Sequence, residues 1–305
     1  MTAPAPSPQP YKRLVWTDWA LLVAVNLVWS LNIVFVKLSV DAVAPMTAAF
    51  LRQLIFGLVC LPFIRIVPGK MRTILAIALI SGGMFYVLTN FALVNARNVA
   101  AVAIVGQLSV PFSVILSVIF LGERIGLPRI AGIAMAFVGV LLVGFDPRII
   151  HEGLALLLNA AAAFVWAIGS ILTRRVSDVP VRTLFAWIGL VGSINMALLS
   201  LIFEPGAMAG VPDLAPATFG AIAFSAIGST LIGHGGFSWL VQRHPINVVI
   251  PYTLVSPILA VIFSAMVFGA PVTALAVFGG IVTLAGVTII TLRSAKKGLV
   301  VEESA

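Results

Sequence analysis

Residues 98–144 read NVAAVAIVGQLSVPFSVILSVIFLGERIGLPRIAGIAMAFVGVLLVG, which is two long apolar runs separated by a short polar link. The link holds Gly122, Glu123 and Arg124, and each run is close to the length that crosses a bilayer as a helix. The same layout returns 147 positions later, in residues 245–291, where Gly269 takes the place of Gly122. Further identical pairs at this offset are Val102 and Val249, Ser109 and Ser256, Ser117 and Ser264, Gly132 and Gly279, and Gly139 and Gly286. The chain is therefore a tandem duplication.

The composition indicates a protein embedded in lipid. Of the 305 residues, 61% are hydrophobic and 9% are charged, and the mean hydropathy is +1.16. Soluble domains carry about 25% charged residues. The single Cys60 excludes an internal disulfide and a cysteine-rich metal site. Because the sequence also has no Walker A motif, we expect no ATP hydrolysis and no cofactor or metal.

Ten apolar segments predict an all-α membrane protein of ten transmembrane helices. They cover residues 19–39, 46–67, 73–94, 99–121, 128–145, 153–176, 181–203, 217–241, 246–269 and 271–292. The predicted divisions are an N-terminal tail (1–17), a first repeat of five helices (18–147), a second repeat of five (148–293) and a C-terminal tail (294–305). Since five is odd, the second repeat enters the membrane inverted relative to the first, as in many secondary transporters.

The positive charges predict the orientation. Fourteen of the eighteen Lys and Arg residues fall on one side of the membrane if the alternation of spans is followed, and three fall on the other. The positive-inside rule then places both termini in the cytoplasm and the chain in the inner (plasma) membrane. The same rule explains the net charge of +8 without nucleic acid as a partner.

Short motifs in both halves resemble the EamA module of the drug/metabolite transporter superfamily. In the first half they are Trp29, residues 50–52 (Phe-Leu-Arg), Phe91-Ala92-Leu93, Ala100-Ala101, Pro111 and residues 120–124 (Phe-Leu-Gly-Glu-Arg). In the second half they are Val165-Trp166-Ala167, Ser256-Pro257 and Phe268-Gly269. Ala270 departs from the pattern, because the family usually has Glu there, and Pro111 is one position out of register with Pro257. The resemblance implies a ten-helix exporter of small metabolites, and the chain is similar to amino-acid exporters of the YddG type.

Polar side chains within spans are costly and usually face the bundle interior or a cavity. Asn26, Trp29 and Ser30 share one face of the first span, and Trp166 is the counterpart of Trp29 in the second repeat. Tryptophan prefers the membrane interface, yet both lie near mid-span. We therefore predict that they form opposing walls of a central cavity, with ordinary packing between helices as the alternative.

Other polar residues of the spans are further candidates for substrate binding. His234 lies in the glycine-rich run 233–236 and could contact substrate or a proton, although a neutral histidine bonded to a carbonyl is the favoured interpretation. The remaining candidates are Tyr86 and Asn90 in the third span, Gln107 in the fourth, and Tyr252 and Ser256 in the ninth.

Charged residues near the span ends could act as gates. Lys37 and Arg174 are candidates to meet a carboxylate, or else to snorkel to the interface. For Arg52, inside the second span, a structural role is favoured. No span has Asp or Glu in its interior, so coupling to protons through a buried acid is not expected.

Stripes of small residues predict close helix packing. They are Ser109, Ser113 and Ser117, their counterparts Ser256, Ala260 and Ser264, and the glycine pairs Gly132/Gly139 and Gly279/Gly286. The glycine pairs predict that the fifth and tenth spans are packing elements.

Together these observations predict a secondary transporter that exports small metabolites, most of all amino acids, by alternating access, and that is not an enzyme. A drug or purine exporter of the same fold is the alternative. An intramembrane enzyme is disfavoured, because His234 has no acid within several turns. Because the duplication already supplies two facing halves, we expect a monomer whose partners are a small-molecule substrate and the lipid bilayer.

Overall fold

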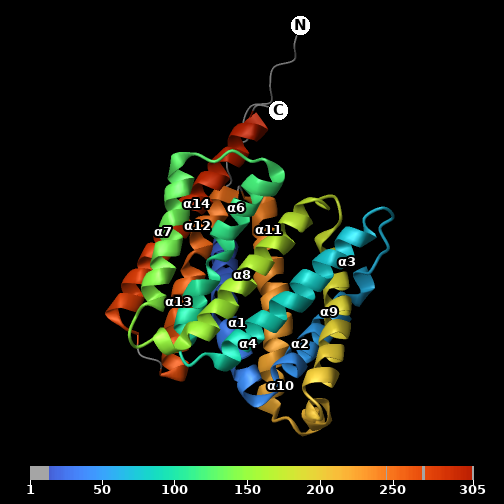
Figure 1. Ribbon diagram of the computed structural model, residues 1–305. Coiled ribbons are helices and arrows are strands. Elements are labelled where there is room, and N and C mark those ends of the chain that lie inside the picture. Colours follow the sequence, from blue (N-terminus) through green and yellow to red (C-terminus); the bar gives the residue numbers. More distant parts are fainter. Residues whose placement is uncertain (1–13, 245, 270–271, 304–305) are drawn as a thin grey trace.

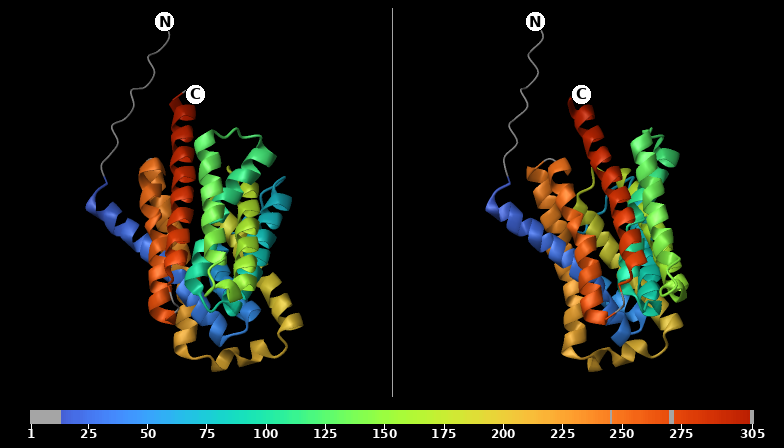
Figure 2. Two further views of the ribbon diagram at one scale, coloured as in Figure 1. Left: turned by 60° about the vertical axis from the view of Figure 1, so that its left-hand side comes forward. Right: turned by 90° about the vertical axis from the view of Figure 1, so that its left-hand side faces the viewer.

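A computed structural model describes residues 14–244, 246–269 and 272–303 (Figure 1). Within these ranges the secondary structure is helical, without strands. The helices form one bundle, in which α1 (Trp16–Ala42) begins and α14 (Ala274–Glu303) ends toward the same end, here called the terminal end. The opposite end carries the 3-10 segment η4 (Ala207–Asp213) and is called the η4 end (Figure 2).

Among the residues that the structure describes, ten helical segments are long and apolar enough to cross a membrane, which confirms the ten predicted spans. After α1 they comprise α2 (Pro45–Cys60) with η1 (Leu61–Phe63); α3 (Met71–Leu79), η2 (Ile80–Met84) and α4 (Phe85–Asn95); α5 (Val99–Gly106) and α6 (Ser109–Leu121); α7 (Leu127–Gly144); η3 (Ile150–Glu152) and α8 (Gly153–Arg174); α9 (Val181–Phe203); α10 (Pro216–Ala223), η5 (Phe224–Gly235) and α11 (Gly236–Arg243); α12 (Ile246–Thr253) and α13 (Val255–Phe268); and α14. α14 continues as a helix beyond Arg293, through part of the expected C-terminal tail. Residues 1–13 of the expected N-terminal tail, and Ala270, lie outside the described residues.

The two repeats interrupt their helices at equivalent positions. α6 ends at Gly122 and α13 at Gly269, with φ angles of 65° and 62°. Glycine adopts this left-handed conformation without the steric cost that a side chain would bring. The break between α5 and α6 likewise matches the break between α12 and α13. The sequence correspondence of Gly122 with Gly269 is therefore visible in the backbone.

The third and eighth spans, which are counterparts, each contain a π-helical segment. η2 holds Gly82 and Gly83, and η5 holds Gly233, His234 and Gly235 of the glycine-rich run. The wider turn of a π-helix shifts the side chains that follow it, and such segments are frequent at functional sites. Both segments flank the cavity described below.

Counterpart helices pack against each other through glycine. α7 and α14 lie side by side (Figure 2), and a Cβ on Gly286 would be 2.5 Å from the carbonyl oxygen of Gly132. α2 and α9 meet in the same way, because a Cβ on Gly189 would be 2.5 Å from Cα of Gly57. The predicted role of the fifth and tenth spans as packing elements is confirmed. On α13, which packs against α1, the stripe Ser256, Ala260 and Ser264 is buried, as expected.

The largest hydrophobic core lies at the η4 end. It joins residues from both repeats, among them Val40, Leu93, Val99, Ile149 and Ile222. At this end α1 packs against α4. Their counterparts in the other repeat, α8 and η5, face each other across a cavity nearer the terminal end. Between these helices the bundle is therefore packed at the η4 end and hollow toward the terminal end.

Candidate binding cavity

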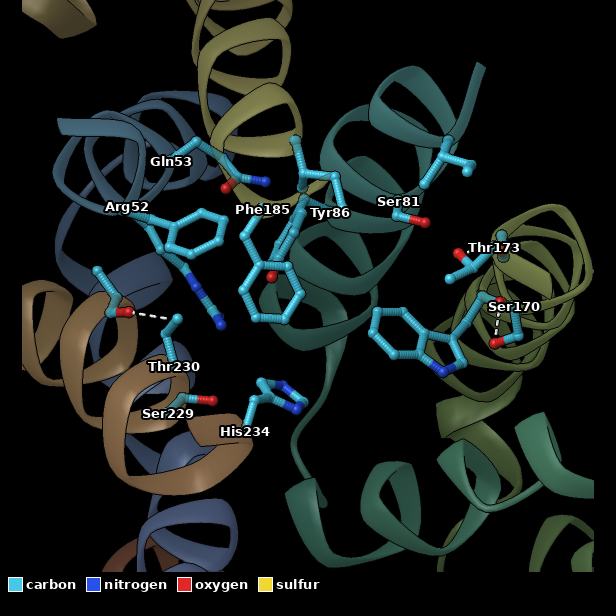
Figure 3. Close-up of a pocket in the computed structure, with 16 residues that line it drawn as sticks. Arg52, Gln53, Ser81, Tyr86, Ser170, Thr173, Phe185, Ser229, Thr230 and His234 are labelled. Carbon is cyan, nitrogen blue, oxygen red and sulfur yellow. Dashed lines mark hydrogen bonds between the residues drawn. The ribbon is translucent and has the colours of Figure 1, made fainter. Parts of the chain in front are cut away.

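A cavity of about 320 Å³ lies between the two repeats (Figure 3). Its volume is at the lower end of the range for small-molecule sites. The first repeat contributes α2, α3, η2 and α4 to its walls, and the second contributes α8, α9 and η5. The lining residues are Arg52, Gln53, Phe56, Ile77, Ser81, Tyr86, Trp166, Gly169, Ser170, Thr173, Phe185, Ile188, Ala226, Ser229, Thr230 and His234.

Arg52 is the cation of this cavity. Its guanidinium carbon lies 4.8 Å from the ring centroid of Tyr86, within the range of a cation–π contact. Figure 3 shows the side chain reaching from α2 toward Thr230 and His234. Among the described residues it has no hydrogen-bond or ion-pair partner. The sequence favoured a structural role for Arg52; the structure adds that the residue lines the cavity, which hydropathy could not indicate.

Hydroxyl groups on α8 and η5 present acceptors to the cavity. Ser170 donates to the carbonyl oxygen of Trp166 at 3.0 Å, and Thr173 donates to that of Gly169 at 2.9 Å. Thr230 does the same on η5, at 2.7 Å. Since each O–H is used within its own helix, the oxygen lone pairs remain for a ligand. No Asp or Glu of the described chain lines the cavity.

Aromatic rings form the apolar walls. Trp166, which is 37% exposed, packs against Phe85 with ring centroids 5.0 Å apart. On the other side Phe185 lies against Phe56, at 5.7 Å, and near His234, at 6.1 Å. These rings offer stacking surface at both sides of the space, as is usual in a small-molecule pocket.

Trp29 stands behind this wall. Its ring lies 5.5 Å from His234, which lines the cavity, but Trp29 is not itself a lining residue. Gly233 makes the contact possible, because a Cβ there would overlap the indole nitrogen of Trp29. The two tryptophans thus take different places: Trp166 in one wall and Trp29 behind the opposite one.

Toward the η4 end the cavity is closed by packed side chains. A remaining void of about 10 Å³, lined in part by Arg52, Asn90 and Ser225, has room for one water molecule at most. Asn90 donates to the carbonyl oxygen of Pro45 at 2.7 Å, and Ser225 donates to Asn32 at 2.8 Å. Arg52 lines both spaces and therefore marks the boundary between the open and closed parts.

Carboxylates reinforce the closed end. Glu204, just after α9, accepts hydrogen bonds from the backbone N–H groups of Met46 and Thr47 at 2.7 and 2.8 Å and from the Thr47 hydroxyl at 2.8 Å. These are donors at the start of α2, which the helix itself cannot satisfy. Glu152 accepts from the N–H of Arg97 at 2.9 Å, and Asp146 accepts from the hydroxyl of Thr273. Each bond joins one repeat to the other.

Besides Trp29, five predicted binding residues lie apart from both the cavity and the small void. Asn26 donates to the carbonyl oxygen of Leu22 at 2.8 Å, and Ser30 donates to that of Asn26. Gln107 is at the break between α5 and α6, and Ser256 is buried in the small-residue stripe of α13. Tyr252 packs edge-on against Trp19, with centroids 4.8 Å apart.

The two candidate gating charges are already paired. Lys37 lies 2.6 Å from Asp41, one turn along α1. Arg174 lies 2.7 Å from Glu123, in the turn after α6, and both side chains are partly exposed. Neither residue lines the cavity. Of the predicted binding residues, the structure therefore brings Tyr86, Trp166 and His234 to the cavity, and places Asn90 at its closed end.

One buried acid lies at the terminal end. His244 Nε2 is 2.9 Å from an oxygen of Asp18, and the two side chains are 5% and 4% exposed. The contact ties the start of α1 to the end of α11, away from the cavity lining. Within the described part of the chain, no cluster of His, Cys, Asp or Glu has the arrangement of a metal site.

Several lining residues were missed from the sequence. Ser170 and Thr173 follow Trp166 at i+4 and i+7, so extending the face of Trp166 along the helix identifies them. Phe185 and Thr230 carry no such signal, because they are ordinary residues of apolar spans and reach the cavity only through helix packing.

Comparison with known proteins gives a consistent relationship. The profile of a family described as the EamA-like transporter family matches the chain twice, over residues 17–145 and 153–292. Two curated relatives carry the name probable amino-acid metabolite efflux pump. The one from Escherichia coli K12 is 27% identical over 89% of this chain and 94% of its own, and the one from Salmonella typhimurium LT2 is 29% identical over the same shares.

Two further matches agree in extent. An uncharacterized transporter of Archaeoglobus fulgidus is 26% identical over 89% of this chain and 98% of its own. A crystal structure with 21% sequence identity aligns over 92% of this chain and 98% of its own, with a TM-score of 0.58, which supports the fold alone.

Proposed function

Because this chain belongs to the EamA-like transporter family, we propose that it is a secondary transporter that exports small carboxylate-bearing metabolites, above all amino acids, by alternating access. The observation that carries the proposal is the cavity itself. It is built from both repeats, is hollow toward one end and is packed shut toward the other. The names of the bacterial relatives support amino acids as the substrate class.

The exchange between two states follows from the paired contacts of the repeats. If the second repeat is inverted, α1 against α4 and α8 against η5 are equivalent pairs at opposite ends of the bundle. The first pair is in contact and the second is separated by the cavity. Closing α8 onto η5 while parting α1 from α4 would move the opening to the other end without new kinds of contact.

The proposed state is open to the cytoplasm. The positive-inside rule places the terminal end, with its Arg and Lys residues, in the cytoplasm and the chain in the inner membrane. The cavity lies toward that end, as Ile77 near the start of the third span and Thr173 near the end of α8 show. An exporter loads its substrate from this side.

Transport is proposed to proceed without proton coupling. Proton relays within membranes usually use Asp or Glu, and no described carboxylate lines the cavity. The buried acids Asp18, Asp146 and Glu152 are engaged with His244, Thr273 and a backbone N–H, respectively. Their hydrogen bonds hold helix ends together instead of facing the path.

Counterflow of labelled amino acids into liposomes containing the purified protein tests the function. We expect flux for several amino acids, and the same flux with and without a pH gradient. Flux that follows the gradient would contradict uncoupled transport and make His234 the first candidate proton carrier. Flux of planar drugs or purines in place of amino acids would overturn the substrate class while leaving the transport mechanism intact.

A further inference from the structure

We propose that Arg52 makes a free carboxylate the obligatory group of the substrate and leaves the amino group dispensable. On this inference, which rests on the proposed transport function, the site accepts N-acylated amino acids as well as amino acids. It rejects the corresponding amides, esters and amines. The chemical class is thus an organic carboxylate with an apolar body, not specifically a zwitterion.

The charges that line the cavity are unbalanced. Arg52 contributes a permanent positive charge, and none of the described residues of the lining carries a carboxylate. Carboxylates elsewhere in the described chain are bonded to other groups, as Glu204 is at the start of α2 and Glu123 is with Arg174. A cation in a largely apolar space is stabilised by an anion that forms hydrogen bonds to it. The substrate is the source of that anion.

An amino group finds only neutral partners here. Ser170, Thr173 and Thr230 present acceptor lone pairs, and Tyr86 and Trp166 present ring faces. An ammonium group can use these acceptors, but the N–H of an acylated nitrogen can use them too. Acylation also removes a positive charge that would otherwise share the cavity with Arg52. The neutral acceptors therefore do not require an ammonium.

The position of Arg52 allows it to bind the carboxylate of the substrate throughout transport. It lines both the open cavity and the small void toward the η4 end. Its side chain is directed into the space between Tyr86, Thr230 and His234 (Figure 3). A carboxylate bound there lies at the boundary that has to open next, so the same contact serves loading and release.

The contributions of the carboxylate and of the amino group can be separated with four compounds that share the same aromatic ring. They are phenylalanine, N-acetylphenylalanine, phenylalaninamide and phenethylamine. In liposomes we expect flux of the first two to agree within about tenfold. The amide and the amine should move about 10- to 100-fold more slowly, which corresponds to the loss of one charge-assisted hydrogen bond. Amide flux equal to that of phenylalanine, or loss of flux on acetylation alone, would overturn the inference.

Variants locate the effect. Arg52→Gln should lower flux of the two carboxylates to that of the amide without lowering flux of the amide, and Arg52→Lys should restore part of the carboxylate flux. Arg65→Gln is the matched control, because Arg65 is an exposed residue of the loop after α2. An equal loss for acid and amide in Arg52→Gln would indicate a structural role and overturn the inference.

Thermal shift of the detergent-purified protein by the same four compounds provides a readout that does not depend on flux. Stabilisation by the two carboxylates but not by the amide supports the role of Arg52, even if flux is absent and the transport proposal fails. Equal stabilisation by acid and amide overturns it, whatever the flux assay shows.

Discussion

The two ends of the bundle use the same kinds of helices in different ways. At the η4 end α1 packs against α4, and Glu204 and Asp146 bond to groups of the other repeat within a large apolar core. At the terminal end the counterparts α8 and η5 stand on opposite sides of the cavity. There the repeats are joined by ion pairs at the surface, Arg174 with Glu123 and Lys70 with Asp178, and by the buried contact of Asp18 with His244.

The difference teaches where the energy of the closed end comes from. Exposed ion pairs contribute about 0–1 kcal/mol, whereas hydrogen bonds to charged groups within a packed core contribute about 1.5–3 kcal/mol each. Opening the η4 end therefore requires breaking the largest core, whereas toward the terminal end the repeats share smaller clusters, such as the one around Ile77 and Leu184, and the Asp18–His244 contact. Substrate bound at Arg52, between the two, is the natural source of compensating interactions.

The largest expected effect concerns the buried contact between His244 and Asp18 at the terminal end. His244→Ala leaves the Asp18 carboxyl group buried without this hydrogen-bond partner, which costs about 3 kcal/mol. Thermal unfolding in detergent measures the loss. His151→Ala, at an exposed position of η3, is the control and should unfold like the wild type. Equal unfolding temperatures for all three proteins would show that this contact does not hold α1 to α11.

Next comes the closed end. Glu204→Ala removes the acceptor of three hydrogen bonds at the start of α2, and we expect a loss of about 1.5–3 kcal/mol. In addition, a cysteine placed at position 225 should react faster with a thiol reagent added from the η4 side in the Glu204→Ala protein than in the protein that retains Glu204. Asp213→Ala, at an exposed residue of η4, is the matched control. Unchanged labelling at position 225 would contradict a role of Glu204 in closure.

Filling the cavity should affect transport more than stability. Ser170→Leu introduces a larger apolar side chain into the lining and occupies part of the space available to substrate, without overpacking a filled core. We expect flux to fall about tenfold or more, with little change in the unfolding temperature. Ser170→Ala keeps the space and loses only one acceptor, so its flux should fall less. Equal fluxes for the Leu and Ala variants would show that substrate does not occupy this wall.

The smallest effect concerns an exposed ion pair of the terminal end. The hydrogen bond from Lys70 lowers the pKa of the Asp178 carboxyl below its usual value of 3.8. A lowered folded-state pKa stabilises the fold above the unfolded-state value, and this contribution is lost as the pH falls through the folded-state value. Asp178→Asn should therefore lower the unfolding temperature slightly at neutral pH and not at all at about pH 2. A difference that persists in acid would point to another cause.

Much of this fold could be predicted from the sequence because its determinants are local or repeated. Apolar runs define the spans. The repeat aligns Gly122 with Gly269, and both residues end their helices in the same left-handed conformation. The glycines of α7 and α14 likewise identify a close helix contact, since few other residues tolerate it.

The cavity was less accessible to such reasoning. Asn26 and Ser30 are polar residues within a span, but each donates its side-chain hydrogen bond to a carbonyl group of its own helix. For Arg52 the sequence could not show that the side chain contacts Tyr86 and faces the cavity, because this depends on how the other helices pack around it. The rotation of a helix that contains a π segment is also not visible in a hydrophobic pattern, so the aim of Ser81 and His234 had to come from the structure.

The bond from Glu204 to α2 bears on how the chain is made. Thr47 and Glu204 are separated by 157 residues. During synthesis the second span is therefore complete well before the group that caps it has left the ribosome. Until then the first N–H groups of α2 are hydrogen-bonded only by water at the membrane surface, and the η4 end of the early bundle is not yet fully closed. The first repeat, although it has five helices of its own, completes this end only when the seventh span has been inserted.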